Sequence, residues 1–176
     1  SAEGNFVSLE AALSKSLRPA RVHRRKEIEN YLVVPAALDR ALARAVADRE
    51  ARGGGVGNAC CDAAVLLREI TDPLRDDVQS QLIARRTTYL RSTRKDVADL
   101  TRETLAWFSP RWENLATRLS LVPGKDVLGA YRDRVQTTLR VSLTDARIVD
   151  AMHMDEIPPD LASLVGRVEA FRTLQA

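Results

Sequence analysis

The sequence predicts a mainly α-helical fold, a bundle of about seven to eight helices joined by short turns. Apolar residues recur at spacings of three and four through most of the chain, and strand-type alternation is scarce. Proline and glycine interrupt this pattern at intervals short enough to separate individual helices. The 176 residues, of which 45% are hydrophobic, suit a domain with a buried core.

The first part of the chain is expected to alternate between helix and irregular segments. Residues 6 to 17 carry an apolar stripe typical of a short helix, which Pro19 ends. Residues 20–25, "ARVHRR", could form a short edge strand or an extended linker. Pro35 suits the first turn of a helix that runs to about Arg52. The glycine-rich "GGGVGN" that follows predicts a flexible turn; no Gly-Lys-Ser/Thr follows it, so it is no phosphate loop.

The remaining helices are predicted from apolar spacing and from capping residues. Asn58 is expected to cap a helix that ends near Ile70, and "TDP" restarts a helix that continues to about Arg94. Ser109 and Pro110 are expected to begin a new helix, with Trp107 and Trp112 packing at this junction. The other predicted helices cover residues 96–107, 126–140, about 143–153 and 159–174.

The composition favours a soluble cytoplasmic protein with no membrane partner. No run of about 18 apolar residues is present, and no apolar signal region begins the chain. The adjacent Cys60 and Cys61 fit a reducing compartment and show no metal-binding spacing. Four lysines stand against 23 arginines, a bias that suits phosphate recognition. A GC-rich genome would produce the same bias without any selection for binding.

The stretch "RRKEIENYLVVP", residues 24–35, contains two carboxylates two positions apart, Glu27 and Glu29. Mg²⁺ and Mn²⁺ prefer oxygen ligands, and two-metal nucleases gather several carboxylates from different elements. These two glutamates could supply part of such a metal site but could not complete it. Alternatively, both could compensate the positive end of the helix that begins there.

Two further segments are candidates for contact with nucleic acid. In "VPGKD", Gly124 and Lys125 stand at a helix start, where backbone N–H groups attract anions; an ordinary structural turn is the alternative. The segment "ARRTTYLRSTRK" (84–95) has no acidic residue and carries Tyr89 among its cations. A solvated helix face is the alternative here. Its candidate DNA-binding residues are Arg85, Arg86, Arg91, Arg94 and Lys95.

Two stretches, "RRKEIENYLVVPAALDRAL" and the "LSLVPGKDVLGAYRDRV…MDEIPPDL" region, together resemble TOPRIM nucleases of the OLD (overcoming lysogenization defect) type. The resemblance covers most of residues 21–172, although residues of about 50–115 match no motif. It implies a Mg²⁺- or Mn²⁺-dependent DNA endonuclease that is coupled to an ATPase and often serves in phage defence. It also implies that Arg25 and Lys26 lie near the scissile DNA and that Glu27 or Glu29 lies near the metals. We therefore expect Lys26, Glu27 and Glu29 to be catalytic residues, and Arg24 and Arg25 to bind DNA.

The family's Asp-x-Asp pair, its first catalytic glutamate and its ATPase motifs are not found in this sequence. We therefore expect the C-terminal part of a larger enzyme, with residues 1–35 as the end of a TOPRIM-like α/β region and 36–176 as a helical domain. ATP would bind elsewhere in that enzyme, and this chain alone would be inactive. DNA and the remaining TOPRIM and ATPase domains would be its partners, and a homo-oligomer is compatible. The rival hypothesis is a non-enzymatic helical module that binds other proteins.

Overall fold

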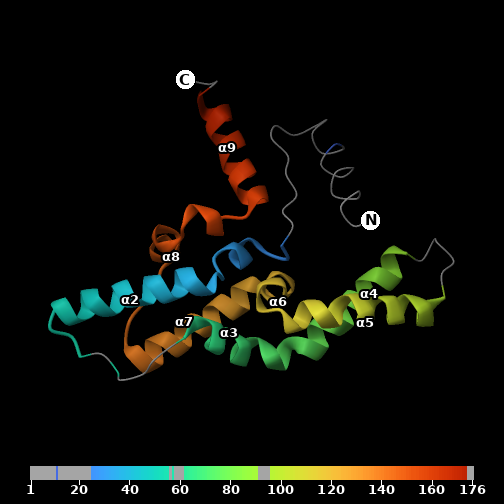
Figure 1. The fold of residues 1–176 in the computed structure, drawn as a ribbon, viewed down its shortest axis with the longest axis horizontal. Helices are drawn as coiled ribbons and strands as arrows, with labels where there is room; N and C mark the ends of the chain where they lie inside the picture. Colours follow the sequence, from blue (N-terminus) through green and yellow to red (C-terminus); the bar gives the residue numbers. More distant parts are fainter. Residues whose placement is uncertain (1–10, 12–24, 56, 58–61, 91–95, 174–176) are drawn as a thin grey trace. The chain divides into compact units, whose positions relative to one another are not determined.

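The mainly helical fold is confirmed by the computed structural model, which describes residue 11 and residues 25–55, 57, 62–90 and 96–173 (Figure 1). No strand occurs among these described residues. The predicted helix at 6–17 and the edge strand at 20–25 fall almost entirely outside them. The chain forms two compact units, one of residues 26–152 and one of residues 1–25 with 153–176.

The helices of the two units follow the prolines and caps of the sequence. In the smaller unit the described elements are the 3₁₀ turn η4 (Met154–Glu156) and α9 (Pro159–Thr173). In the larger unit the elements are η1 (Ile28–Tyr31), α2 (Pro35–Ala51), α3 (Ala63–Thr71), η2 (Asp72–Leu74), α4 (Arg75–Tyr89), α5 (Val97–Glu113), α6 (Leu115–Leu121), α7 (Gly124–Leu139) and α8 (Asp145–Ala151). Within the described residues, no helix is long and apolar enough to cross a membrane.

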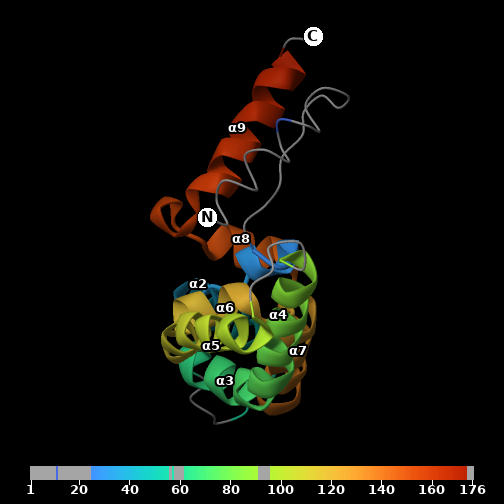
Figure 2. The ribbon, with the colours of Figure 1, turned by 90° about the vertical axis from the view of Figure 1, so that its right-hand side faces the viewer.

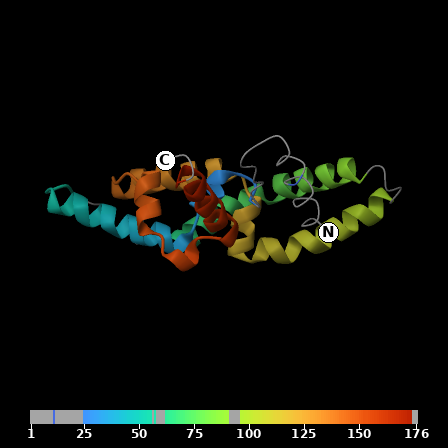
Figure 3. The same ribbon diagram turned by 90° about the horizontal axis from the view of Figure 1, so that it is seen from above.

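Neighbouring helices of the larger unit pack into one hydrophobic core. Helix α2 contacts α3 and α8, α3 contacts α7, and α4 pairs with α5. Figures 1 and 2 both place α3 below α2 and α6, and Figure 3 shows α2 and the α4–α5 pair at opposite ends of this unit. The largest fully enclosed side chains of the core include Trp112, Tyr131, Phe108, Leu38 and Leu67.

The predicted helix break at Ser109 and Pro110 is wrong, because α5 continues through both residues to Glu113. Pro110 lacks the N–H that would bond the carbonyl of Ala106, but Ala106 is exposed and water can reach that carbonyl. Ser109 does not cap a helix, since its hydroxyl donates to the Leu105 carbonyl at 3.0 Å. The cap is Asn114, whose side chain accepts the Thr117 N–H at the start of α6.

Two other helix ends differ from the prediction. The cap of α3 is Asp62, whose carboxylate accepts the Val65 N–H at 3.0 Å; Asn58 lies outside the described residues. Helix α4 ends at Tyr89, short of the expected Arg94.

The two tryptophans differ in burial. Trp112 is buried, whereas Trp107 is 37% exposed, and the Arg111 guanidinium lies over it, 4.3 Å from the Trp107 ring centroid.

Arg118 is a buried cation that joins α6 to the turn between α3 and α4. Its Nε donates to the Trp112 carbonyl at 2.6 Å, and its Nη1 donates to Asp72 Oδ1 at 2.6 Å and to Thr71 Oγ1 at 3.3 Å. The guanidinium also lies 4.9 Å from the Trp112 ring centroid. Every contact of this group is therefore internal, and Arg118 is not available for a ligand.

Asp39 provides a test of how α2 holds the start of α3. Its Oδ1 accepts the N–H of the buried Ala63 at 2.8 Å. Desolvation by burial raises the pKa of Asp39 above the ordinary 3.8, although this hydrogen bond opposes the shift. We expect Asp39→Ala to lower the free energy of unfolding by about 1–3 kcal/mol, because the Ala63 N–H loses its acceptor.

The matched variant Asp39→Asn keeps an oxygen acceptor and removes the charge, so we expect its stability at pH 7 to stay within about 1 kcal/mol of wild type. Because the folded-state pKa is raised, the wild-type carboxyl stabilises the fold more as the pH falls through that pKa, and Asp39→Asn lacks this gain. Urea unfolding followed by circular dichroism at neutral and acidic pH measures both effects. Equal stability of Asp39→Ala and wild type would contradict the role of this bond.

Candidate functional site

The buried side chain of Asn30 fixes the 3₁₀ turn η1 against the loop between α6 and α7. Asn30 is 0% exposed. Its Nδ2 donates to the carbonyls of Leu119 at 2.7 Å and Val122 at 3.0 Å, and its Oδ1 accepts the Glu27 N–H at 2.7 Å. All three bonds lie in a water-poor environment, where an unpaired polar group is costly. The position of the "KEIENY" segment is therefore set by residues about ninety positions later in the chain.

Gly124 makes this close approach possible at the first position of α7. A Cβ built on Gly124 would lie 2.6 Å from the Asn30 nitrogen and 2.7 Å from its Cγ, distances that real Cβ atoms do not show. The glycine of "VPGKD" is thus required by the approach of a neighbouring backbone. The prediction that "VPGKD" opens a helix is confirmed, two residues earlier than expected.

Glu27 lies at the positive end of α7. Its Oε2 accepts the backbone N–H of Lys125 at 2.8 Å, across 98 residues of sequence. A carboxylate in the first turn of a helix complements both the free N–H groups and the helix dipole. Glu27 therefore compensates a helix start, as the structural alternative proposed. It forms a capping box with Asn30 at η1, the turn that follows it in sequence, and it also accepts the hydrogen bond at the start of α7. A phosphate at the Lys125 N–H would have to displace this carboxylate.

The two glutamates could contribute oxygen ligands to a divalent cation but do not complete a metal site. Glu29 is half-buried, and its carboxylate makes no hydrogen bond to a described residue. Nowhere in the described part of the chain do three or more His, Cys, Asp or Glu side chains lie where they could hold one ion. Mg²⁺ or Mn²⁺ at Glu27 or Glu29 would therefore need further ligands from other residues.

Lys26 connects this region to α4. Its backbone N–H donates to the Ser120 carbonyl at 3.3 Å, and its Nζ donates to Gln81 Oε1 at 3.4 Å. Arg85 and Tyr89 follow Gln81 at spacings of four, which places the three on one side of α4. Arg85 is exposed and Tyr89 is 66% exposed. Lys26 thus lies beside the described half of the arginine-rich segment.

The other predicted DNA-binding residues differ in where they lie and in what they contact. Arg86 turns inward and donates to Thr104 Oγ1 at 3.2 Å, so it joins α4 to α5. Lys125 is exposed, whereas Arg25 belongs to the smaller unit and already has an interaction partner. Four residues of the prediction lie outside the described residues, namely Arg24, Arg91, Arg94 and Lys95.

A second feature, a pocket rich in arginine, was not predicted from the sequence. It has a volume of about 330 Å³, and its walls include Arg49, Arg52, Arg140 and Arg147. We call it the arginine pocket. The only local signal in the sequence is the spacing of three between Arg49 and Arg52, since the other two arginines come from helices about ninety residues later.

Comparisons with protein-family models, with curated proteins and with solved structures found no match for this chain. The two stretches quoted above meet through several hydrogen bonds: those of Asn30 to Leu119 and Val122, of Lys26 to Ser120, and of Glu27 to Lys125.

Substitution of two glycines in α7 tests the close packing of η1 against the start of α7. Gly124→Ala is expected to lower the free energy of unfolding by about 1–3 kcal/mol or more, because its Cβ collides with the Asn30 backbone. Gly129→Ala is the matched control: no atom lies within 4 Å of its built Cβ, and alanine should stabilise this helix by about 0.5–1 kcal/mol. Urea unfolding of both variants measures the difference. Opposite signs are expected; a neutral Gly124→Ala would disprove the close approach.

Proposed function

We propose that this chain is the C-terminal helical part of a metal-dependent TOPRIM-type DNA endonuclease, linked to an ATPase and used in phage defence. The observation that carries the proposal is the Glu27–Lys125 hydrogen bond, which joins the two stretches that resemble OLD-type nucleases. These stretches are about ninety residues apart in sequence, and the packing of η1 against the start of α7 brings their polar residues together. In this proposal they form one edge of the cleavage centre.

The charges on this edge suit a DNA backbone. Lys26, Arg85 and Lys125 are half-buried or exposed, and none forms a salt bridge with a described residue. Lysine and arginine bind phosphate oxygens and release counterions, so each contact would add salt-dependent affinity. Lys26, three positions before Glu29, would then hold the scissile phosphate near the carboxylates.

The metal would be Mg²⁺ or Mn²⁺, with Glu27 and Glu29 as candidate ligands. The Lys125 N–H fixes one carboxylate oxygen of Glu27, and such hydrogen bonds orient ligands before a metal binds. The described residues cannot hold the ion alone. The remaining ligands would come from the acidic strand of a TOPRIM domain, and ATP would bind a further domain.

The second candidate is a helical module that binds a protein partner without catalysis. It is favoured by the internal use of Asn30 and Glu27, whose hydrogen bonds to α6 and α7 give this segment a structural role that needs no metal. In that case the exposed cations would contact an acidic protein surface.

Glu29→Ala separates the two candidates. In the complete gene product we expect it to lower Mg²⁺- or Mn²⁺-dependent cleavage of supercoiled plasmid by about a hundredfold or more, since a metal ligand is lost. The melting temperature should not change, because this carboxylate bonds no described residue. Glu69→Ala removes an exposed carboxylate of α3, 3.9 Å from Arg134, and should cleave at the wild-type rate. Wild-type cleavage by Glu29→Ala would remove this residue from the site, and no cleavage by the wild type would favour the helical module.

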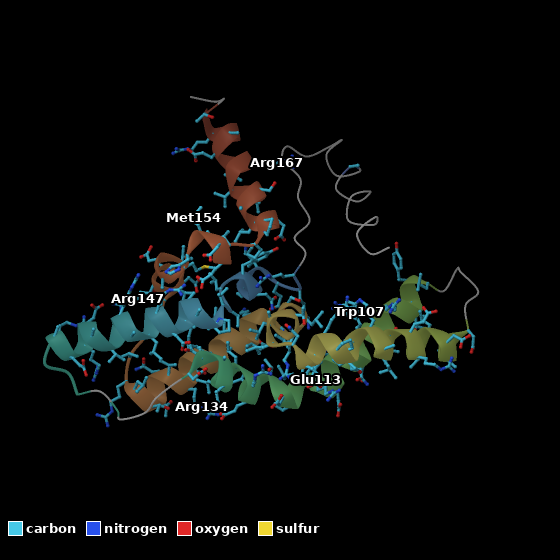
Figure 4. All side chains as sticks on the ribbon, in the orientation of Figure 1. Trp107, Glu113, Arg134, Arg147, Met154 and Arg167 are labelled. Atoms are coloured by element: carbon cyan, nitrogen blue, oxygen red, sulfur yellow. The ribbon has the colours of Figure 1, made fainter. Side chains whose placement is uncertain are left out.

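DNA binding by the 176-residue chain tests the basic edge. Wild-type affinity for duplex DNA should fall with salt, by roughly 0.9 log units per decade of salt for each phosphate contacted. Lys26→Gln, Arg85→Gln and Lys125→Gln should each reduce this slope by about one contact. Arg134→Gln, on α7 (Figure 4), should leave it unchanged. Fluorescence anisotropy over a salt series measures the slopes, and a salt-independent affinity would contradict DNA binding at this edge.

A further inference from the structure

The arginine pocket lies entirely within the larger unit, where the ends of α2 and α7 meet the start of α8. Arg49 is in the last turn of α2 and Arg52 follows that helix directly. Arg140 ends α7, and Arg147 lies in the first turn of α8, where Figure 4 labels it. Four arginines from the ends of three helices thus line one pocket of about 330 Å³.

Among the described residues, no carboxylate lines this pocket, and one of its arginines is paired with an acidic residue. Arg147 Nη2 lies 2.9 Å from Asp48 Oδ2. Arg49 and Arg52 each donate only Nε, to the carbonyls of Gly55 at 2.8 Å and Asp48 at 3.0 Å. These bonds fix the two side chains and leave their terminal N–H groups available. The intervening loop, residues 53–61, contains no acidic residue that could neutralise them.

Arg140 adopts a backbone conformation that arginine rarely takes. Its φ of 59° and ψ of 30° are left-handed, and no other non-glycine residue of the described part has a positive φ. Glycine is the usual residue at this position after a helix, because a Cβ is unfavourable there. The Arg140 side chain makes no hydrogen bond or ion pair with a described residue. An arginine at a strained position, with no partner among the described residues, points to a role for its side chain.

The helix dipole explains only part of this arrangement. Cations are favourable at helix C-termini, which accounts for Arg49 and Arg52 at the end of α2. Arg147 lies in the first turn of α8, where a cation is unfavourable. An arginine at a neighbouring position with negative φ would interact equally well with the dipole of α7, so the dipole does not explain Arg140. Mutual repulsion of guanidinium groups around one pocket also calls for an anion.

We propose that the arginine pocket binds a compact phosphate group with two or more negative charges, either a polyphosphate or a terminal phosphate monoester. Arginine forks match phosphate oxygens in bidentate geometry, and the hydroxyls of Ser142 and Thr144 also line the walls. The volume is at the low end for ligand pockets, which favours a small anion. This site is separate from the proposed cleavage edge and requires no metal.

Calorimetric titration of the 176-residue chain with pyrophosphate, in metal-free buffer, tests the site. The wild type should bind one equivalent. Arg140→Gly should weaken binding by about tenfold or more, because a charge-assisted contact is lost. Its melting temperature should equal or exceed that of wild type, because glycine accepts the left-handed conformation. Arg134→Gln removes another arginine of α7 and should bind as the wild type does.

Two further ligands identify the source of the phosphate. A dinucleotide with a 5′-phosphate that binds more tightly than its unphosphorylated form would assign the pocket to strand ends. Binding of pyrophosphate with no preference between the dinucleotides would assign it to free polyphosphate. Absence of saturable pyrophosphate binding, or equal weakening by Arg140→Gly and Arg134→Gln, would overturn the proposal. Arg52→Gln serves in place of any variant that fails to fold. The assay measures no cleavage, so its result is independent of the nuclease proposal.

Discussion

The side-chain amide of Asn30 is the interaction on which the candidate cleavage edge depends. Its three hydrogen bonds replace water for the Leu119 and Val122 carbonyls and for the Glu27 N–H. An apolar substitute would leave these groups unpaired, at about 1–3 kcal/mol for each buried group. With η1 held in this way, the Glu27 carboxylate reaches the first turn of α7, and Lys26 reaches α4. The placement of Lys26, Glu27 and Glu29 therefore follows from one buried amide and from the missing Cβ of Gly124.

The arginines of this chain serve at least three physical purposes, so their number does not measure a DNA-binding surface. Arg118 is buried and supplies hydrogen bonds between helices, and Arg86 does the same at the surface of the α4–α5 pair. The arginine pocket concentrates four more around a small volume, which suits a compact anion more than an extended backbone. Among the described residues, Arg85, Lys26 and Lys125 are the cations left for duplex contact on the proposed cleavage edge.

Local chemistry made the fold class and many helix boundaries predictable, because a proline in the first turn or a capping side chain acts within four residues. Pro35 opens α2 as expected, and Gly124 opens α7 directly after Pro123. The same reasoning failed at Pro110, where α5 continues because packing outweighs one missing hydrogen bond. Contacts between distant residues were beyond local reasoning. The Glu27–Lys125 hydrogen bond and the shared pocket of Arg49 and Arg140 join residues about ninety or more positions apart. No local sequence pattern indicates either of them.

Helix α7 carries both proposed sites, one at each end, and its electrostatics favour this arrangement. The positive end accepts the Glu27 carboxylate, and the negative end lies beside Arg140. With 16 residues the helix is about 24 Å long, which exceeds the Debye length of about 8 Å at physiological salt. Charge at one end is therefore screened from the other. Binding of a phosphate in the arginine pocket could therefore affect Glu27 only if α7 moved as a rigid body. The buried Asn30 opposes such movement, because a shift of Gly124 toward Asn30 would bring α7 into its backbone and a shift away would lengthen the hydrogen bond to Val122.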